Sequence, residues 1–247
     1  MKMNGNTVLV TGGASGIGLA IAARFLAAGS RVLICGRRED KLREAKRRHP
    51  DLQAFVCDVS SEAGRGQLWR WATAEFPQLN VLVNNAGIQH RIGLERGETW
   101  MQAEQEIATN LAAPIHLSML FVPHLLGQAN PALINVTSGL AFTPLARVPV
   151  YCATKAALRS FTLSLRHQLE KTPLQVIEII PPAVDTDLGG PGLHTFGVAL
   201  DEFADAVMQR LAAGEIEIAY GLAQKASQAS RPELDEIFRR MNAPEPG

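Results

Sequence analysis

The chain has 247 residues, of which 47% are hydrophobic and 19% are charged, a composition that is typical of a globular protein rather than a disordered one. Its 24 lysines and arginines balance 24 aspartates and glutamates, and this zero net charge argues against a general binder of nucleic acid or of acidic membranes. No apolar run is long enough to span a bilayer, and Cys35, Cys57 and Cys152 offer no disulfide framework, so we expect a cytoplasmic protein.

Short apolar runs alternate with helical patterns along the chain. The expected strands are Thr7–Val10, Arg31–Cys35, Gln53–Cys57, Val81–Val83, Ala132–Val136, Gln175–Ile180 and Ile216–Ala219. The expected helices are Ile17–Ala28, Glu39–Arg48, Ser61–Phe76, Glu98–Leu126, Val150–Lys171, Asp201–Ala213 and Pro232–Met241. This alternation predicts an α/β fold in which helices cover both faces of a doubly wound parallel sheet. The length fits one domain, spanning residues 1–247.

A glycine-rich turn, Thr11-Gly12-Gly13-Ala14-Ser15-Gly16-Ile17-Gly18, directly follows the first expected strand and opens the first helix. Glycines let backbone N–H groups approach a pyrophosphate, and the start of the helix adds unpaired donors and a positive dipole end. A plain structural loop is the alternative interpretation. The position between strand and helix favours a dinucleotide site.

The residues at the end of the second expected strand indicate whether the site prefers NAD or NADP. Its sequence is Ile34-Cys35-Gly36-Arg37-Arg38, so Gly36 stands where an acidic residue would bind the ribose 2′-hydroxyl of NAD. Arg37 can instead pair with the 2′-phosphate of NADP. Alternatively, Arg37 and Arg38 begin the solvated face of the next helix. The missing carboxylate favours NADP over NAD.

Tyr151 and Lys155 lie one turn apart on an expected helix and therefore share a face. Reduction of a ketone needs a proton donor, and an isolated phenol has a pKa near about 10. We expect the ammonium group of Lys155 to lower the pKa of Tyr151. Ser138 follows the strand Ala132–Val136, where its hydroxyl could hold a carbonyl oxygen. A surface Tyr/Lys pair and a turn serine are the structural alternatives.

These motifs, taken together, resemble the short-chain dehydrogenase/reductase family. The matching segments, in chain order, are Thr11 to Gly18, Cys57-Asp58-Val59, Asn84-Asn85-Ala86-Gly87, Asn110, Ser138 and Tyr151-Cys152-Ala153-Thr154-Lys155. More loosely, Tyr151–Leu169, Pro181–Gly190 and Glu233–Met241 resemble the bacterial DltE-like oxidoreductases. The order of the motifs is more specific than any one of them. One departure is Pro182, which stands where relatives usually carry glycine.

The resemblance implies a Rossmann-type sheet of about seven strands and assigns roles to residues at matching positions. Contacts to the pyrophosphate are implied for Gly12, Ser15, Gly16, Ile17 and Gly18. Contacts to the adenine are implied for Asp58 and Val59, to the adenosine ribose side for Asn85, Ala86 and Gly87, and to the nicotinamide carboxamide for Val184 and Thr186. Tyr151 and Lys155 would adjoin the nicotinamide ribose, and Asn110 would bend its helix and link Lys155 to solvent through water. Asp58 has a second interpretation, as a turn residue.

The substrate side is expected to include a lid loop at about 187–200, because glycines and prolines concentrate there. A plain connector is the alternative. The candidate pocket residues are Gln89, Leu140, Phe142, Val148 and His194. This mostly apolar set indicates a small or medium hydrophobic ketone or alcohol. The histidines form no cluster with metal-ligand spacing, so we expect no metal site.

The sequence therefore predicts an NADP(H)-dependent oxidoreductase, a carbonyl reductase that interconverts a ketone or aldehyde and an alcohol, with Tyr151 as general acid/base. A catalytically silent dinucleotide sensor and an NAD-preferring dehydrogenase are the alternatives. The resemblance also implies a homotetramer or homodimer formed through the helices at about 98–126 and 150–171. We expect neither a nucleic-acid nor a membrane partner.

Overall fold

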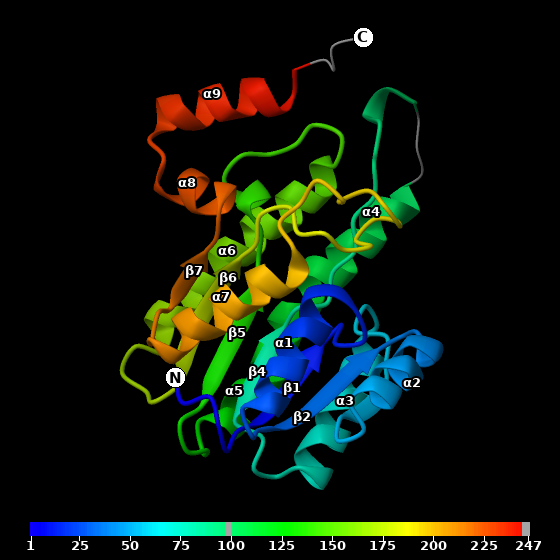
Figure 1. Cartoon of the computed structure of the whole chain (residues 1–247), viewed down its shortest axis with the longest axis vertical. Coiled ribbons are helices and arrows are strands. Elements are labelled where there is room, and N and C mark those ends of the chain that lie inside the picture. Colours follow the sequence, from blue (N-terminus) through cyan, green and yellow to red (C-terminus); the bar gives the residue numbers. More distant parts are fainter. Residues whose placement is uncertain (97–99, 244–247) are drawn as a thin grey trace.

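The computed structural model describes residues 1–96 and 100–243. A seven-stranded sheet with the order β3-β2-β1-β4-β5-β6-β7 forms its centre, and all neighbouring strands are parallel (Figure 1). The strands are β1 (Thr7–Thr11), β2 (Arg31–Gly36), β3 (Gln53–Val56), β4 (Val81–Asn84), β5 (Ala132–Val136), β6 (Gln175–Ile180) and β7 (Glu217–Ala219). The predicted doubly wound Rossmann-type sheet is confirmed.

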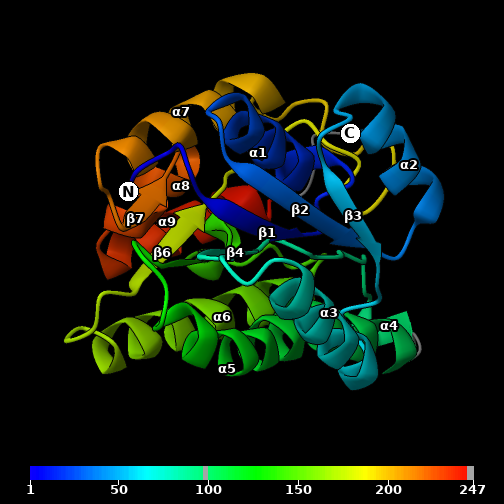
Figure 2. The ribbon, with the colours of Figure 1, turned by 90° about the horizontal axis from the view of Figure 1, so that it is seen from below.

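Helices cover both faces of this sheet. They are α1 (Gly16–Ala27), α2 (Glu39–Arg48), α3 (Glu62–Glu75), α4 (Trp100–Ile107), α5 (Ala113–Leu125), α6 (Pro149–Gln168), α7 (Leu200–Ala212), α8 (Leu222–Gln228) and α9 (Arg231–Met241). Figure 2 shows α1, α2 and α7 on one side and α3 to α6 on the other. None of the helices in the described ranges combines the length and apolar character needed to cross a bilayer.

Successive side chains of a strand point to opposite faces of the sheet, so each strand contributes to two hydrophobic cores. In β1, Val8 and Val10 belong to the cluster that includes Ile21 and Phe25 of α1, whereas Leu9 belongs to the cluster on the opposite face. Each such side chain is fully buried, which stabilises the fold by about 1.5–3 kcal/mol. A strand that is buried on both faces therefore needs a continuous apolar run.

The structure differs from the predicted helices in one division and one addition. The single helix expected from Glu98 to Leu126 is divided into α4, a π-helical turn at Ala108–Ala112 and α5; its expected start at Glu98 lies outside the described residues. The short helix α8 was not predicted, because Leu222–Gln228 has no long apolar stripe. It forms by packing, with Ala223 buried against the 3₁₀ turn Gly139–Ala141.

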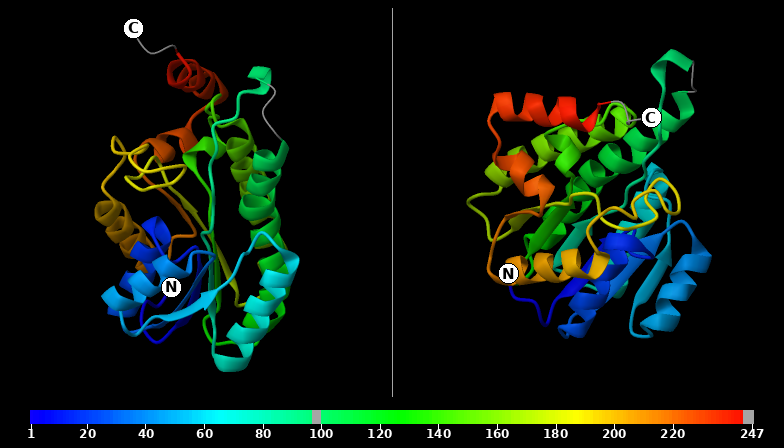
Figure 3. Two further views of the ribbon diagram at one scale, coloured as in Figure 1. Left: turned by 90° about the vertical axis from the view of Figure 1, so that its right-hand side faces the viewer. Right: turned by 45° about the horizontal axis from the view of Figure 1, so that its top comes forward.

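Helix α9 lies beyond the carboxyl ends of the strands (Figure 3). Asn242, which follows it, accepts a hydrogen bond from the Ala146 amide at 2.6 Å and donates one to the Pro144 carbonyl at 3.1 Å. These bonds tie the C-terminal segment to the loop that precedes α6.

Candidate active site

A cavity of about 1670 Å³ runs along the carboxyl edge of the sheet. This volume exceeds the roughly 300–1,000 Å³ of an ordinary small-molecule site, so an elongated ligand and a second molecule can fit together. The predicted cofactor residues that line it are Gly12, Ser15, Gly16, Ile17, Gly18, Arg37, Asp58, Val59, Asn85, Ala86, Gly87, Tyr151, Lys155, Val184 and Thr186. The structure thus gathers the complete predicted cofactor set, although the role of each residue stays a prediction.

The glycine-rich turn forms one end of the cavity. Gly12 and Gly16 have φ values of 64° and 53°, in the left-handed region that favours glycine. A Cβ atom at Gly18 would lie 2.5 Å from the Gly12 carbonyl oxygen, so the turn depends on close backbone approach. At the start of α1, Ser15 forms no capping hydrogen bond and the first turn contains no acidic residue. Its amide groups therefore remain suitable for an anion.

The end of β4 is fastened to this turn. The Thr11 hydroxyl accepts hydrogen bonds from the amides of Asn85 and Ala86, each at 3.0 Å. The Asn85 side-chain amide donates to the Thr11 carbonyl at 3.0 Å. These bonds hold the ends of β1 and β4 together, which places Ala86 against Gly12 of the glycine-rich turn, and both residues line the cavity.

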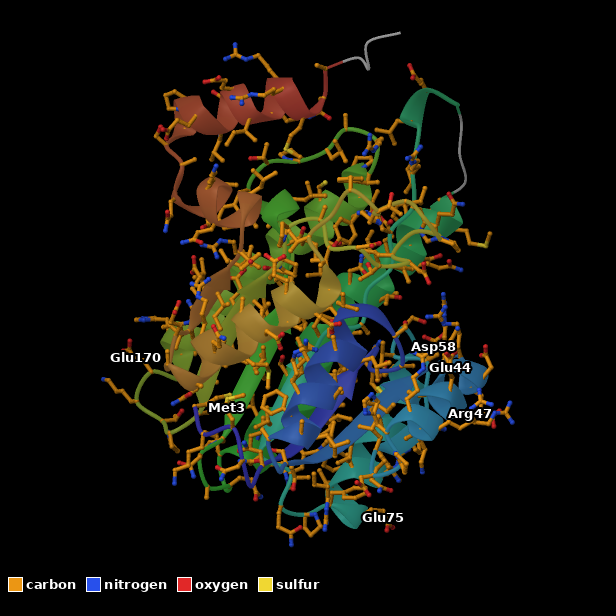
Figure 4. All side chains as sticks on the ribbon, viewed as in Figure 1. Met3, Glu44, Arg47, Asp58, Glu75 and Glu170 are labelled. Atoms are coloured by element: carbon orange, nitrogen blue, oxygen red, sulfur yellow. The ribbon has the colours of Figure 1, made fainter. Side chains whose placement is uncertain are left out.

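Two arginines and an aspartate follow β2 and β3. Arg37 is exposed and has no ion pair among the residues that the structure describes, whereas Arg38 donates to the Ser15 hydroxyl at 3.1 Å. Asp58, labelled in Figure 4, accepts a hydrogen bond from the Ser60 amide at 2.9 Å. Asp58 is therefore a turn residue that also lines the cavity, so the two interpretations of it are compatible.

Ser138, Tyr151 and Lys155 meet in the same cavity. Ser138 follows β5, while Tyr151 and Lys155 lie one turn apart near the start of α6. The Lys155 ammonium donates to the Val136 carbonyl at 2.8 Å and lies 5.7 Å from the centre of the Tyr151 ring. Ser138 forms a side-chain hydrogen bond with Tyr151 and also accepts one from the Leu140 amide at 3.1 Å. Ser138 is therefore both a turn residue and a neighbour of the Tyr151 phenol.

Burial is the largest cause of the pKa shifts of Tyr151 and Lys155. Tyr151 is 6% exposed and Lys155 is 3% exposed. Desolvation raises the pKa of Tyr151 well above its usual value, while the hydrogen bond with Ser138 lowers it. Desolvation also lowers the pKa of Lys155 to about 8. Burial is thus the largest cause acting on the phenol, and the expected lowering of the pKa of Tyr151 by the Lys155 ammonium stays a prediction.

Asn110 lies in the π-helical turn between α4 and α5 and is fully buried. Its side chain donates to the Ile88 carbonyl at 2.8 Å and accepts from the Ile88 amide at 2.9 Å. Asn110 therefore does not line the cavity; it holds the loop after β4 beside Lys155. The irregular turn agrees with the expected bend, and the water-mediated link to Lys155 stays a prediction.

Sequence reasoning missed Glu106, which lies one turn before Asn110 in α4. It is 0% exposed, and one carboxyl oxygen accepts a hydrogen bond from the His90 amide at 2.5 Å. The other oxygen has no hydrogen-bond partner in the described part of the chain. Desolvation raises the pKa of Glu106 to about 7. A glutamate on the apolar face of an expected helix was the available signal.

The substrate side of the cavity differs from the expectation in one of the five predicted residues. Gln89, Leu140, Val148 and His194 line the cavity, but Phe142 does not. Side chains in a 3₁₀ turn are about 120° apart, so Leu140 and Phe142 face different directions. The Phe142 ring packs 4.4 Å from the Arg159 guanidinium instead. Beside the predicted, mostly apolar residues, the wall also includes the charged or polar side chains of His90, Arg91 and Arg147.

The expected lid segment, 187–200, lies at the cavity, to which Leu188, Leu193, His194 and Phe196 contribute. A bridge between Val184 and Val198 closes its base, and α7 begins at Leu200. Helix α9 forms a further part of the wall that the sequence did not indicate. Closure of the segment over a substrate stays a prediction.

Comparison with known proteins identifies the family of the chain. Residues 6–193 match the family model described as short chain dehydrogenase. The chain is 47% identical to the uncharacterized oxidoreductase DltE of Bacillus subtilis, over 99% of this chain and 100% of that protein. It is 34% identical to the NADP-dependent 3-hydroxy acid dehydrogenase YdfG of Escherichia coli, over 72% of each chain.

Solved structures show the same likeness. A short chain dehydrogenase from Burkholderia cenocepacia in complex with NADP superposes with a TM-score of 0.85 at 26% identity, covering 99% of this chain and 100% of that one. A structure described as the closed form of serine dehydrogenase complexed with NADP⁺ has a TM-score of 0.79 at 27% identity, covering 91% and 97%. With the glycine-rich turn, the sheet order and the family match in agreement, the chain belongs to the short-chain dehydrogenase/reductase family of oxidoreductases.

Proposed function

We propose that the protein is an NADP(H)-dependent oxidoreductase that interconverts a carbonyl compound and an alcohol, with Tyr151 as the general acid/base. The observation that carries this proposal is the meeting of Ser138, Tyr151 and Lys155 in a cavity that continues to the glycine-rich turn. Three polar groups of this kind, taken out of water beside a dinucleotide-sized site, suit the transfer of a proton to a carbonyl oxygen.

The residues fit an NADP cofactor. The uncapped start of α1 and the left-handed glycines Gly12 and Gly16 suit a pyrophosphate. Exposed Arg37 can pair with a 2′-phosphate, and Gly36 offers no carboxylate to the 2′-hydroxyl of NAD. The names of the Escherichia coli relative and the Burkholderia structure both include NADP. When bound, the cofactor supplies or accepts the hydride.

Tyr151 donates its proton to the carbonyl oxygen during reduction, and the Ser138 hydroxyl donates a hydrogen bond to the same oxygen. Lys155 then returns a proton to the phenolate. That return is favourable because burial lowers the pKa of Lys155 to about 8 while it raises the pKa of Tyr151. Asn110 keeps the loop after β4 in place beside the ammonium. Oxidation of the alcohol uses the same groups in reverse.

The chain contains 2 tyrosines, which provides a matched test. Tyr151→Phe should reduce kcat/KM for carbonyl reduction by about 10² to 10⁴ while NADPH binding, measured by fluorescence titration, persists. Tyr220→Phe should leave the activity unchanged, because Tyr220 lies outside the cavity and donates to Glu202. Near-wild-type reduction by Tyr151→Phe would remove the assignment. NADPH binding without reduction of any carbonyl compound would favour a dinucleotide sensor.

Cofactor choice has its own test. The wild type should use NADPH with a higher kcat/KM than NADH, and Arg37→Ala should abolish most of that difference. Arg43→Ala, an exposed arginine of α2 outside the cavity, serves as the control. Equal use of both cofactors by the wild type would discard the phosphate role of Arg37.

We also propose assembly as a homotetramer or homodimer through α5 and α6. Apolar side chains on these helices face solvent, among them Met119, which is 68% exposed, and Leu163, which is 43% exposed. Burial of such a patch between copies removes apolar area from water. Light scattering should give the mass of two or four chains, and a monomer at micromolar concentration would contradict this part of the proposal.

A further inference from the structure

Two arginines from adjoining segments line the substrate end of the cavity. Arg91 lies in the loop after β4, and Arg147 precedes α6; both are exposed and both line the cavity. A backbone hydrogen bond of 3.2 Å from the Ile92 amide to the Arg147 carbonyl joins the two segments. Neither guanidinium forms an ion pair within residues 1–96 and 100–243. By contrast, Arg240, on the α9 wall, is paired with Glu236 at 2.8 Å.

His194 is influenced by both guanidinium groups. Burial is the largest cause that lowers the pKa of His194, and the charges of Arg147 and Arg91 lower it further, while Asp185 raises it. The Nδ1 atom of His194 is buried and has no hydrogen-bond partner in the described ranges. The same corner of the cavity therefore holds two unpaired cations and an imidazole whose pKa lies below its ordinary value.

The loop that contains Arg91 is held by hydrogen bonds from two buried side chains of the α4–α5 segment. The side chain of Asn110 binds both the amide and the carbonyl of Ile88, and Glu106 accepts from the His90 amide. These anchors come from adjacent turns of the α4–α5 segment, and both are fully buried. A preorganised loop loses little conformational freedom when Arg91 binds a ligand, so a contact there can contribute most of its energy to affinity.

We propose that Arg91 and Arg147 bind a carboxylate group of the substrate, so that the enzyme acts on oxo acids and the matching hydroxy acids. The planar guanidinium fork matches the two oxygens of a carboxylate. An anion between two neighbouring arginines also removes the repulsion between them. The inference rests on the proposed function, since Ser138 and Tyr151 would hold the carbonyl end of the same molecule.

The test compares oxo acids of increasing chain length with their methyl esters, with NADPH oxidation followed by absorbance. At least one acid should have a kcat/KM about tenfold or more above that of its ester, as expected for charged hydrogen bonds. Arg91→Ala and Arg147→Ala should each remove most of this difference and leave the ester within about twofold of wild type. Arg43→Ala, on α2 away from the cavity, should retain the full difference.

A binding measurement separates this inference from the proposed function. In the Tyr151→Phe variant with NADPH bound, the preferred acid should raise the midpoint of thermal unfolding, whereas its ester should not. Adding Arg147→Ala to this variant should abolish the rise. Equal kcat/KM values for acids and esters would overturn the carboxylate site but leave carbonyl reduction standing. Equal loss of acid and ester activity in both arginine variants would also overturn it, as would tighter binding of an oxo phosphate ester than of any acid. Full activity of Tyr151→Phe would instead refute the proposed function.

Discussion

Replacement of Glu106 by glutamine should change how the free energy of unfolding depends on pH. Glu106 is 0% exposed, and desolvation raises its pKa from 4.5 to about 7, with only partial compensation from the His90 amide. The folded protein therefore binds a proton at Glu106 more tightly than the unfolded chain does. The resulting stabilisation is complete below the unfolded-state value of 4.5 and is lost as the pH rises through about 7.

The size of this effect follows from the shift. Each pKa unit corresponds to about 1.36 kcal/mol, and about 1.5 units separate a starting pH of about 5.5 from the folded-state pKa of about 7. The wild type should therefore lose about 2 kcal/mol of stability from this group between about pH 5.5 and about pH 8.5. Glutamine has a similar shape and can still accept from the His90 amide, but it does not titrate.

Urea unfolding of the two proteins at both pH values measures this difference. Glu106→Gln should show a pH dependence about 2 kcal/mol smaller than that of the wild type. Glu104→Gln, on the exposed side of the same helix, controls for the loss of a carboxylate. Its free energy of unfolding should depend on pH as that of the wild type does. An identical pH dependence in Glu106→Gln and wild type would refute the idea that this carboxyl titrates as a buried acid.

Two further predictions concern the glycine-rich turn and the far side of the sheet. Gly18→Ala should lower NADPH affinity and destabilise the fold by about 1–3 kcal/mol, because its Cβ would meet the Gly12 carbonyl oxygen at 2.5 Å. Gly66→Ala in α3, where the nearest atom is 3.6 Å away, should not destabilise in the same thermal and binding assays. Arg159→Leu should cost about 3–5 kcal/mol in urea unfolding, because it leaves the 0% exposed Glu178 without its 2.5 Å partner. Adding Glu178→Gln should recover most of that loss, and a double variant as unstable as the single one would contradict the role of the ion pair.

Local patterns were sufficient to predict the sheet and the position of the cofactor turn. Apolar runs such as Ala132–Val136 have one structural solution in a sheet that is covered on both faces, and glycines after the first strand mark a tight turn. The spacing of Tyr151 and Lys155 places both on one helix face, and the structure brings both to the cavity. These features depend on neighbours in sequence.

The features that the sequence did not reveal depend on contacts between distant segments. Arg91 and Arg147 line the same cavity from two segments that are far apart in sequence and are joined by a backbone hydrogen bond. The direction of Phe142 depends on the 3₁₀ turn before it, and α8 is stabilised by its packing on that turn rather than by its own pattern. The raised pKa of Tyr151 is likewise a result of burial, which the spacing of two residues does not reveal.

The central place of β1 has a consequence for how the chain acquires its structure. The first strand of the sequence pairs on one side with β2 and on the other with β4, whose residues are separated from it by the whole of the first three helices. The middle of the sheet is therefore incomplete until that long intervening stretch has been synthesised and ordered. Loop-closure entropy opposes such non-local pairing. We expect refolding from urea to be slow, with an unpaired edge of β1 transiently open to aggregation.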